Sequence, residues 1–339
     1  MQVIIPLAGK GTRLRPHTHL VPKPLMKVAG RPVMDWVMDR LRGLPVDELI
    51  FITGHLKDQV EAYVRRRYTI PSRFIEQSVQ DGTAGAINLA RPFVHGPVLI
   101  IFVDTVFEAD LSITTTSEDA GIIWAKEVED YQRFGVVVTD AQGYMTRIVE
   151  KPKEPISKLA NIGLYFIRDV DALWQGIDHV LAQPKNKGEW FLTDAFQWMI
   201  EHGRRIRTAE VEGWYDCGAL NTVIETNRIL LQKTVGTGTH GAGPGKRKTA
   251  PRRFAAGVTI VEPVLIEDDV VIEQSTIGPN VTIEAGTVVR ESTVTEAIIG
   301  KRCRIEQCRL DEALLGDDVT VSGLRGGGSL GSHAEVRAR

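Results

Sequence analysis

Four short segments near the C-terminus share one sequence template, and this repeat constrains the fold more than any other feature of the chain. They are residues 266–272, 277–283, 299–305 and 315–321. Each copy places a turn just before an aliphatic residue that can point inward. Repeated units of this kind bury little surface alone, so they are expected to stack into coils around a continuous apolar interior.

The template resembles the hexapeptide repeat of left-handed parallel β-helices, which implies a prism of coils over residues 257–330. Transferases that act on acyl-CoA use the same scaffold, usually with a catalytic histidine. The chain has no histidine between Phe254 and Leu330, and His333 lies beyond the repeats. We therefore expect the coils to be structural, or to assemble a homo-oligomer, rather than to transfer acyl groups.

A glycine turn near the N-terminus predicts a ligand-binding site. An apolar run over residues 3–8 leads directly into Gly9, as in a central parallel strand. Gly9 and Gly11 allow the backbone to approach a ligand closely. Arg13 and Lys23 add positive charge beside the turn. Backbone N–H groups together with two cations suit a polyphosphate.

Other interpretations of this turn have different requirements. A Rossmann fingerprint needs a third glycine opening the helix, and none follows Gly11 in register. A Walker A loop needs a glycine five residues before Gly9, where the chain has Ile4. A plain surface turn needs only the glycine pair, and on that pair alone it stays open.

The glycine pair, Arg13 and the Pro22-Lys23-Pro24 tripeptide resemble the signature of the sugar-phosphate nucleotidyltransferases, a Gly-x-Gly-Thr-Arg-Leu loop followed by Pro-Lys-Pro. This resemblance implies that Arg13 stabilises the departing pyrophosphate and that Lys23 stabilises the α-phosphate. It also implies a set of nucleotide-binding residues in the turn, namely Leu7, Ala8, Gly9, Gly11 and Thr12.

The segment from Gln77 to Gly85 is a second candidate for nucleotide binding. A glutamine amide offers a donor and an acceptor to a base edge, and Gly82 lets main-chain groups reach the same base. On composition alone, an ordinary loop with a helix N-cap at Thr83 is the better interpretation. The segment resembles the one with which pyrimidine-specific family members read uracil or thymine, which implies that Gln77, Gly82 and Thr83 bind the nucleotide.

Two aspartates are candidate ligands of Mg²⁺. The apolar strand over residues 98–103 ends at Asp104, and a carboxylate there suits a hard cation or, alternatively, caps a turn. The family usually has glycine before this aspartate, where the chain has Val103. Residues 213–218 resemble the family's Trp-x-Asp-x-Gly motif, which implies that Asp216 is the second ligand of the same cation.

Four further segments resemble, in order, the half of the family that binds the sugar phosphate. A sugar needs polar groups for its hydroxyls and one cation for its phosphate. A solvated surface pair is the default interpretation of Glu150 and Lys151. The resemblance instead implies a sugar-phosphate site made of Gly135, Glu150, Lys151, Asn161 and Trp214, with the segment 189–195 nearby.

Composition excludes several classes of function. The chain has 339 residues, enough for about two domains. Its net charge of −2 gives no overall attraction to nucleic acid or to a membrane. No signal peptide or membrane span is apparent, so we expect a cytoplasmic protein. Three cysteines without zinc-ligand spacing indicate neither a disulfide framework nor a metal knuckle.

The periodicity predicts an α/β domain over residues 1–232, a Gly-rich basic linker over 233–256 and the β-helix over 257–330. The first domain is expected to be a mostly parallel, Rossmann-like sheet with helices on both faces. The expected strands are residues 3–7, 49–53, 74–76, 98–103, 121–125 and 163–167, and the expected helices are 33–41, 57–67 and 83–90.

Together these features predict an enzyme that transfers a nucleotidyl group from UTP or dTTP to a sugar 1-phosphate, with Mg²⁺ as cofactor and glucose 1-phosphate as the expected acceptor. Two alternatives stay open. One is a GTP-dependent mannose-1-phosphate guanylyltransferase, and the other is a non-catalytic regulatory subunit that binds sugar nucleotides.

Overall fold

The computed structural model describes residues 1–235 and 256–338, so most of the expected linker lies outside the described residues. The chain divides into two compact units, and each unit combines two stretches that are separated in the sequence. The first consists of Met1–Lys10 and Met34–Trp214, and the second of Gly11–Val33 and Tyr215–Arg339. Among the described residues, no helix is both long enough and apolar enough to span a bilayer.

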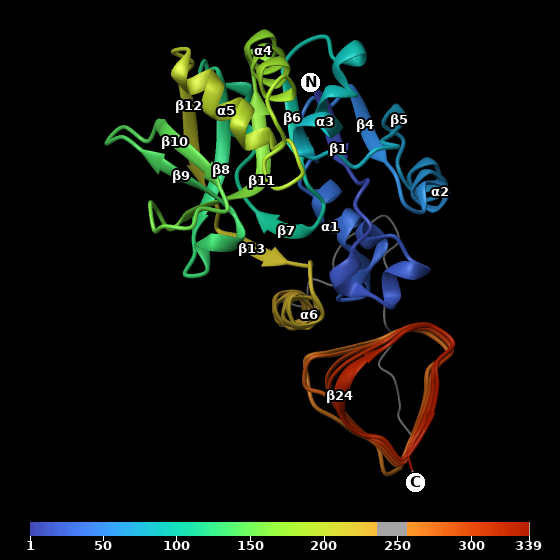
Figure 1. Cartoon of the computed structure of the whole chain (residues 1–339). Helices are drawn as coiled ribbons and strands as arrows, with labels where there is room; N and C mark the ends of the chain where they lie inside the picture. Colours follow the sequence, from blue (N-terminus) through green and yellow to red (C-terminus); the bar gives the residue numbers. More distant parts are fainter. Residues whose placement is uncertain (236–255, 339) are drawn as a thin grey trace. The chain divides into compact units, whose positions relative to one another are not determined.

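The first unit is built on a nine-stranded sheet with the order β10-β9-β11-β6-β1-β4-β5, in which β8 joins β11 and β12 joins β8 (Figure 1). The strands of this sheet are β1 (Gln2–Pro6), β4 (Glu48–Thr53), β5 (Ser72–Glu76), β6 (Val98–Ile101), β8 (Gly121–Glu127), β9 (Gly135–Thr139), β10 (Met145–Glu150), β11 (Leu159–Ile167) and β12 (Ile206–Glu210).

This sheet has the predicted Rossmann-like character, and its parallel part is β6-β1-β4-β5 together with the β8–β12 pair. The strand β11 runs antiparallel to β6, β8 and β9, and β9 and β10 form an antiparallel pair. Antiparallel neighbours need only a short connection. The turn after β9 provides one, since Asp140 Oδ1 accepts hydrogen bonds from the backbone N–H groups of Gln142 and Tyr144. Because it contains both parallel and antiparallel pairs, the sheet is mixed.

The central strands are buried on both faces, as the sequence predicts. Ile4 and Ile50 belong to an apolar cluster that includes residues of three helices, α3, α4 and α5. Val3 and Phe51 are equally inaccessible and point the opposite way, because neighbouring residues of a strand alternate between faces. The helices of this unit are α1 (Val33–Asp39), α2 (Lys57–Arg67), α3 (Thr83–Asn88), α4 (Val170–Leu181) and α5 (Leu192–Glu201).

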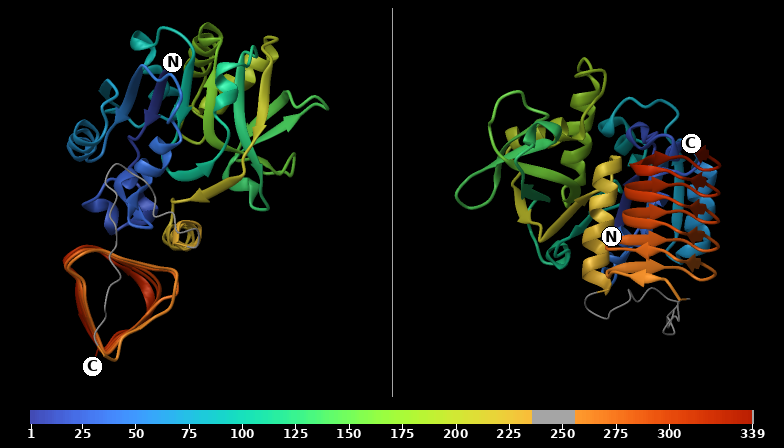
Figure 2. Two further views of the ribbon diagram at one scale, coloured as in Figure 1. Left: turned by 180° about the vertical axis from the view of Figure 1, so that it is seen from behind. Right: turned by 90° about the horizontal axis from the view of Figure 1, so that it is seen from below.

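The second unit contains a parallel β-helix, seen end-on as a triangular prism in Figure 1 and from the side in the right panel of Figure 2. Thr259 pairs with Thr276 and Thr276 with Thr293, so each early coil adds 17 residues. Thr293 pairs with Arg309 and Arg309 with Arg325, so the later coils add 16. This is the arrangement of a left-handed β-helix built from hexapeptide repeats.

Twelve short strands form the three faces of the prism, and every pairing between them is parallel. They are β14 (Thr259–Ile260), β15 (Val264–Ile266), β16 (Val271–Glu273), β17 (Thr276–Ile277), β18 (Val281–Ile283), β19 (Val288–Arg290), β20 (Thr293–Ile299), β21 (Arg304–Glu306), β22 (Arg309–Leu315), β23 (Thr320–Ser322), β24 (Arg325–Leu330) and β25 (Glu335–Arg337). The strand β25 extends the coils beyond residue 330.

The interior of the prism is apolar, as the template predicts. Ile277, Ile299 and Leu315, the first residues of three repeats, all lie in its core. Cys303 and Cys308 lie there as free thiols. Burial raises the pKa of Cys303 to about 11, so this thiol stays protonated near neutral pH.

The second unit also contains Gly11–Val33, which we call the basic loop, and the helix α6 (Leu220–Val235). The basic loop is made of three single-turn helices and a short hairpin: η1 (Thr12–Leu14), η2 (His17–His19), η3 (Lys23–Leu25), β2 (Lys27–Val28) and β3 (Arg31–Pro32). The helix α6 contacts β2 and the coil strands β15, β18, β20 and β22 (Figure 2). The β-helix is thus packed against a loop that the sequence assigned to the other domain.

His17 of the basic loop makes stability depend on pH. Its ring is 5% exposed, its Nε2 lies 2.7 Å from Ser329 Oγ, and burial lowers the pKa of His17 from 6.5 to about 4. Between those two pH values the unfolded chain binds a proton that the folded chain does not. The free energy of unfolding should therefore decrease as the pH falls from about 6.5 to about 4, by roughly 3 kcal/mol in total.

Denaturant unfolding at a series of pH values measures this dependence. His17→Gln keeps a polar partner for Ser329 and should flatten the acidic limb of the curve. His55→Gln replaces a histidine that is not buried, and it should leave that limb in place. Equal acid sensitivity of the His17→Gln variant and the unmodified protein would contradict the assignment.

Candidate active site

The turn of the basic loop has the geometry that the sequence predicts. Gly11 has φ 60°, in the left-handed region, and a Cβ there would lie 3.0 Å from Thr18 Cγ2 and 3.3 Å from Lys23 Cβ. The Thr18 hydroxyl donates to Gly11 O at 2.8 Å and closes the turn. A side chain at position 11 is therefore strained, and the Lys23 side chain lies against the turn.

Arg13 and Asp216 meet at the backbone of Gly218. Asp216 Oδ1 accepts a hydrogen bond of 2.7 Å from Gly218 N. A Cβ on Gly218 would lie 2.8 Å from Asp216 Oδ1 and 3.2 Å from Arg13 Nη2, so those two atoms are no more than about 6 Å apart. The sequence assigned the two side chains to different tasks, and the structure places them together. A side chain at position 218 would push them apart.

Asp216 also suits a metal ligand. Mg²⁺ usually binds one or two carboxylates together with phosphate oxygens of the substrate, and needs no protein cage. The hydrogen bond from Gly218 N orients the Asp216 carboxylate. Within the described ranges, no group of three or more His, Cys, Asp or Glu side chains is arranged as a complete cage. Asp104 belongs to the first unit, in the turn between β6 and β7 (Thr105–Glu108), so a cation shared with Asp216 stays a prediction.

The remaining residues of the glycine turn differ in their surroundings. Leu7 and Ala8 are buried at the end of β1, and Leu7 N donates to Ile52 O at 2.7 Å. A Cβ on Gly9 would meet none of the described atoms within 4 Å, so the backbone there is accessible to a ligand. Thr12 is exposed and begins η1.

The segment from Gln77 to Gly85, which we call the base-reading segment after the hypothesis that it reads the nucleotide base, forms the loop after β5 and the first turn of α3. Gln77 is buried, and its Nε2 donates to Asp81 Oδ1 at 2.9 Å and to Gly82 O at 3.3 Å. Gly82 has φ 121°, and a Cβ there would lie 2.3 Å from Trp190 O. Gln77 is therefore held beside Gly82 by its own side-chain amide.

Thr83 is the first residue of α3 and does not cap it, so only the N-cap part of the ordinary-loop interpretation is wrong. Gly82 occupies the N-cap position, without a side-chain hydrogen bond, and the Thr83 hydroxyl accepts a hydrogen bond of 2.8 Å from Leu192 N instead. Gln80, for which no role was predicted, donates from Nε2 to Ala8 O at 2.6 Å. This bond joins the base-reading segment to the end of β1.

A buried polar cluster lies around the start of β9, and we call it the acceptor cluster. Asn161 Nδ2 donates to Gly135 O at 2.8 Å, and Asn161 Oδ1 accepts from the Tyr165 hydroxyl. Glu150 Oε2 accepts from the Thr193 hydroxyl at 3.3 Å. The cluster consists of Gly135, Glu150, Lys151, Asn161, Tyr165 and Thr193.

Glycine is required at position 135 for steric reasons. A Cβ there would lie 2.2 Å from Asn161 Nδ2, 2.8 Å from Glu150 Oε2 and 3.1 Å from Thr193 Cγ2. Such distances force atoms to move, because side chains in a packed interior have little free space. The absence of a side chain at Gly135 thus lets an amide, a carboxylate and a hydroxyl converge.

The electrostatics of the acceptor cluster follow from its burial. Burial raises the pKa of Glu150, and Lys151 Nζ, 3.6 Å from Glu150 Oε1, opposes that shift. Burial also raises the pKa of Tyr165, and the charges of Glu150 and Asp104 raise it further. Asp104 therefore acts electrostatically on the cluster. The surface-pair interpretation of Glu150 and Lys151 is wrong for Glu150, whose side chain is only 15% exposed.

Trp214 packs beside the acceptor cluster. The centroid of its ring lies 4.9 Å from the centroid of the Phe134 ring, with an interplanar angle of 65°. Phe134 directly precedes Gly135, so this contact fixes the start of β9. The Trp214 Nε1 is buried and has no hydrogen-bond partner among the residues described.

Three residues that the sequence did not single out belong to these sites, namely Gln80, Tyr165 and Thr193. Thr193 lies in the segment 189–195, which resembled the sugar-phosphate half without a role for each residue. Tyr165 lies four residues after Asn161 on β11, and its hydroxyl donates to Asn161 Oδ1 across the strand irregularity between them. Gln80 carried no signal at all.

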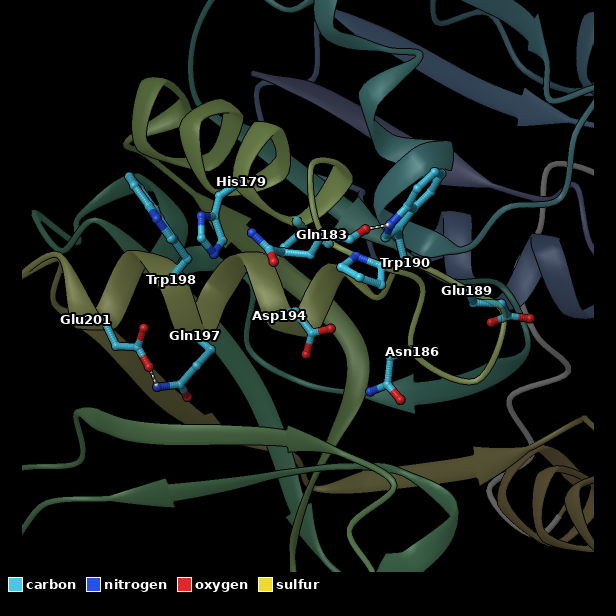
Figure 3. A pocket seen from close by; sticks show the side chains of 11 residues that line it. His179, Gln183, Asn186, Glu189, Trp190, Asp194, Gln197, Trp198 and Glu201 are labelled. Carbon is cyan, nitrogen blue, oxygen red and sulfur yellow. Dashed lines mark hydrogen bonds between the residues drawn. The ribbon is translucent and has the colours of Figure 1, made fainter.

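A separate pocket of about 240 Å³ lies between α4, α5 and the loop that joins them (Figure 3). Its lining includes Trp190, Asp194 and Trp198, and several of its polar groups bond to one another or to the backbone, as Gln197 does to Glu201. Typical ligand pockets measure roughly 300–1,000 Å³. The pocket contains none of the acceptor cluster, and we treat it as a surface crevice between helices.

The sequence model of a family described as "Nucleotidyl transferase" matches residues 2–233, more than half of the chain. The chain belongs to the nucleotidyl transferase family. Its C-terminal coils lie wholly beyond the matched region. The glycine turn, the base-reading segment and the acceptor cluster all lie within it, as the sequence resemblance implied.

Curated relatives place this nucleotidyl transferase among enzymes of the sugar-phosphate type. It is 30% identical over 242 residues to the UTP–glucose-1-phosphate uridylyltransferase AglF of Haloferax volcanii, covering 69% of this chain and 98% of the relative. It is 27% identical to the glucose-1-phosphate thymidylyltransferase of Streptomyces griseus, covering 99% of this chain and 93% of the relative.

The bifunctional protein GlmU of Methanocaldococcus jannaschii is 32% identical over 279 residues, which cover 82% of this chain. The chain spans 61% of the length of that relative. Among solved structures, the UDP-glucose pyrophosphorylase complexed with UDP-glucose superposes with a TM-score of 0.61 at 21% identity, covering 68% of this chain and 98% of that one. This likeness shows the fold of the nucleotidyl transferase region.

Proposed function

We propose that this nucleotidyl transferase moves a nucleotidyl group from UTP or dTTP to glucose 1-phosphate and releases pyrophosphate. The observation that carries the proposal is the acceptor cluster. Its carboxylate, amide and hydroxyl converge over Gly135, beside the ammonium group of Lys151. A sugar phosphate needs that combination, since its hydroxyls require polar partners and its phosphate requires a cation.

The reaction needs positioning and charge stabilisation rather than a covalent enzyme intermediate. An oxygen of the sugar phosphate attacks the α-phosphorus in line, a new P–O bond forms, and the bond to the β-phosphate breaks with release of pyrophosphate. Arg13 would stabilise the charge that develops on the pyrophosphate, and Lys23 would neutralise the α-phosphate. Mg²⁺, when bound, adds charge stabilisation at the phosphates, and Asp104 and Asp216 would hold it.

Initial rates of pyrophosphate release across a matrix of substrates test the function. The nucleotides are UTP, dTTP, GTP and ATP, and the acceptors are the 1-phosphates of glucose, mannose and N-acetylglucosamine. We expect the highest rates with UTP or dTTP and glucose 1-phosphate. A preference for GTP and mannose 1-phosphate would support the guanylyltransferase alternative. If no pair of nucleotide and sugar 1-phosphate released pyrophosphate, the result would support the alternative of a regulatory subunit.

Gln77→Ala should weaken discrimination between bases. Uracil and thymine present an acceptor, a donor and a second acceptor, which the Gln77 amide and the backbone near Gly82 can satisfy together. An unpaired buried polar group costs about 1–3 kcal/mol, so we expect the KM for UTP and dTTP to rise by about tenfold. The KM for the sugar phosphate should change little, because the acceptor cluster does not include Gln77.

Steady-state kinetics with each substrate varied in turn measure both effects. Gln142→Ala is the matched control, since Gln142 lies exposed in the turn after β9 and donates to Asp140 through its backbone N–H. Unchanged nucleotide selectivity in the Gln77→Ala enzyme would mean that this segment does not read the base.

A further inference from the structure

The basic loop extends along the whole β-helix. At one end, Gly331 and Ser329 of the last coil contact Pro16 and His17. At the other end, a Cβ on Gly30 would lie 2.9 Å from Leu265 Cδ2 in the first coil. The strands β15, β18, β20, β22 and β24 lie side by side between these points. Neighbouring strands are about 4.8 Å apart, so the two contacts are separated by roughly 19 Å of rigid sheet.

Two buried contacts hold the middle of the loop. Lys27 Nζ forms an ion pair with Glu284, whose carboxylate is only 7% exposed and directly follows β18. Asn227 of α6 accepts hydrogen bonds from Ala29 N at 2.9 Å and from the Thr282 hydroxyl at 2.8 Å. Asn227 thus joins the basic loop, α6 and the second coil.

The same helix holds Asp216. Thr226, next to Asn227 on α6, donates its hydroxyl to Asp216 O at 2.8 Å. Asp216 in turn lies with Arg13 at Gly218. Through α6, the second coil is therefore connected to the turn that carries Asp216. Through Lys27 and Ala29, the same coil is connected to the basic loop, which also carries Arg13 and Lys23.

We propose that the β-helix positions the phosphate-handling groups of this enzyme, with Glu284, Thr282 and Asn227 as positioning residues. The proposal rests on the proposed function, in which Arg13 and Lys23 act on the phosphates. A stacked sheet suits this task, since its coils hold each other at fixed spacing. The Haloferax relative is covered over 98% of its length by 69% of this chain, so it is too short to contain a counterpart of every part of this chain.

Two conservative substitutions test the proposal in the full-length protein. Glu284→Gln removes the charge opposite Lys27 and keeps the shape of the side chain. Thr282→Val removes the hydroxyl bonded to Asn227. We expect kcat to fall about tenfold in each variant, because misplacement of catalytic groups by fractions of an ångström is costly. The KM for glucose 1-phosphate should stay within about twofold, since the acceptor cluster lies in the first unit.

The control is Glu273→Gln, which breaks an exposed ion pair with Arg290 on another face of the prism. It should change neither kcat nor the melting temperature. Hydrogen–deuterium exchange of residues 11–33 supplies a readout that does not depend on activity. Exchange in that segment should accelerate in Glu284→Gln and Thr282→Val and remain unchanged in Glu273→Gln.

The outcomes separate this proposal from the proposed function. Faster exchange of the basic loop together with a lower kcat would support positioning by the coils. Unchanged exchange, or faster exchange with an unchanged kcat, would overturn it. An unmodified enzyme that releases pyrophosphate from no substrate pair would refute the proposed function, and the catalytic part of this inference with it. The exchange result would then decide by itself whether the coils hold the loop.

Discussion

Arg13→Ala is expected to lower turnover at least ~100-fold, the loss typical when one preorganised group that stabilises transition-state charge is removed. Charge develops on the pyrophosphate as its bond to the α-phosphorus breaks. Arg13 lies on η1 beside the Gly11 turn, close to Asp216. Because the Arg13 side chain is exposed, its removal should leave the melting temperature unchanged. Pyrophosphate release at saturating substrates measures the effect.

Arg15→Ala is the matched control. Arg15 is also exposed and lies two residues further along the same loop, but it has no assigned role in catalysis. Its removal should reduce the rate by less than about threefold, because scattered surface charges contribute little in water at ordinary salt. Equal losses in the two variants would indicate a general electrostatic effect of the loop. Near-normal turnover of Arg13→Ala would show that the catalytic cation has been misassigned.

Gly135→Ala is expected to reduce kcat/KM for glucose 1-phosphate about 100-fold or more, mainly through KM. The added methyl group would collide with Asn161 Nδ2 and Glu150 Oε2. Overpacking costs about 1–3 kcal/mol, and a lost buried hydrogen bond costs a similar amount. The affinity for UTP, measured by calorimetry, should change little, because the base-reading segment contains no residue of the acceptor cluster.

The control for Gly135→Ala is Gly96→Ala. Gly96 lies between η4 (Arg91–Phe93) and β6, and a Cβ there would meet no described atom within 4 Å. The Gly96→Ala substitution should change neither kcat nor KM nor the melting temperature. A normal KM for the sugar phosphate in Gly135→Ala would exclude the acceptor cluster from substrate binding. A lower melting temperature with unchanged KM would show that the cluster serves only to pack the core.

The two ends of the chain were predictable for different reasons. The coils follow from a repeat, in which Ile277 and Ile299 each mark a position that must face inward. The strands β1, β4, β5, β6 and β8 follow from short apolar runs, whereas the parallel strand β12 was not predicted. The helix α2 begins and ends where the sequence places it. The middle of the chain was harder, because β9, β10 and β11 form antiparallel pairs whose partners no local pattern reveals.

The candidate site shows the same division. Gly11, Arg13 and Lys23 could be recognised because a tight turn with adjacent cations is a local feature of sequence. Gly82 and Gly135 were proposed from motifs, and the structure supplies their physical reason, since a side chain at either position would collide with a neighbour. Gln80 could not have been found, because its role depends on the backbone of Ala8, 72 residues away.

The sequence by itself determined the repeat architecture, the buried strands and the chemical types gathered in the site, because these depend on local periodicity and on residues close together in the chain. Only the tertiary structure decided that the basic loop packs along the β-helix, and that Asp216 and Arg13 meet at Gly218. Contacts such as Lys27 with Glu284 join residues more than 250 positions apart. Their formation depends on how complete elements pack, which no short stretch of sequence records.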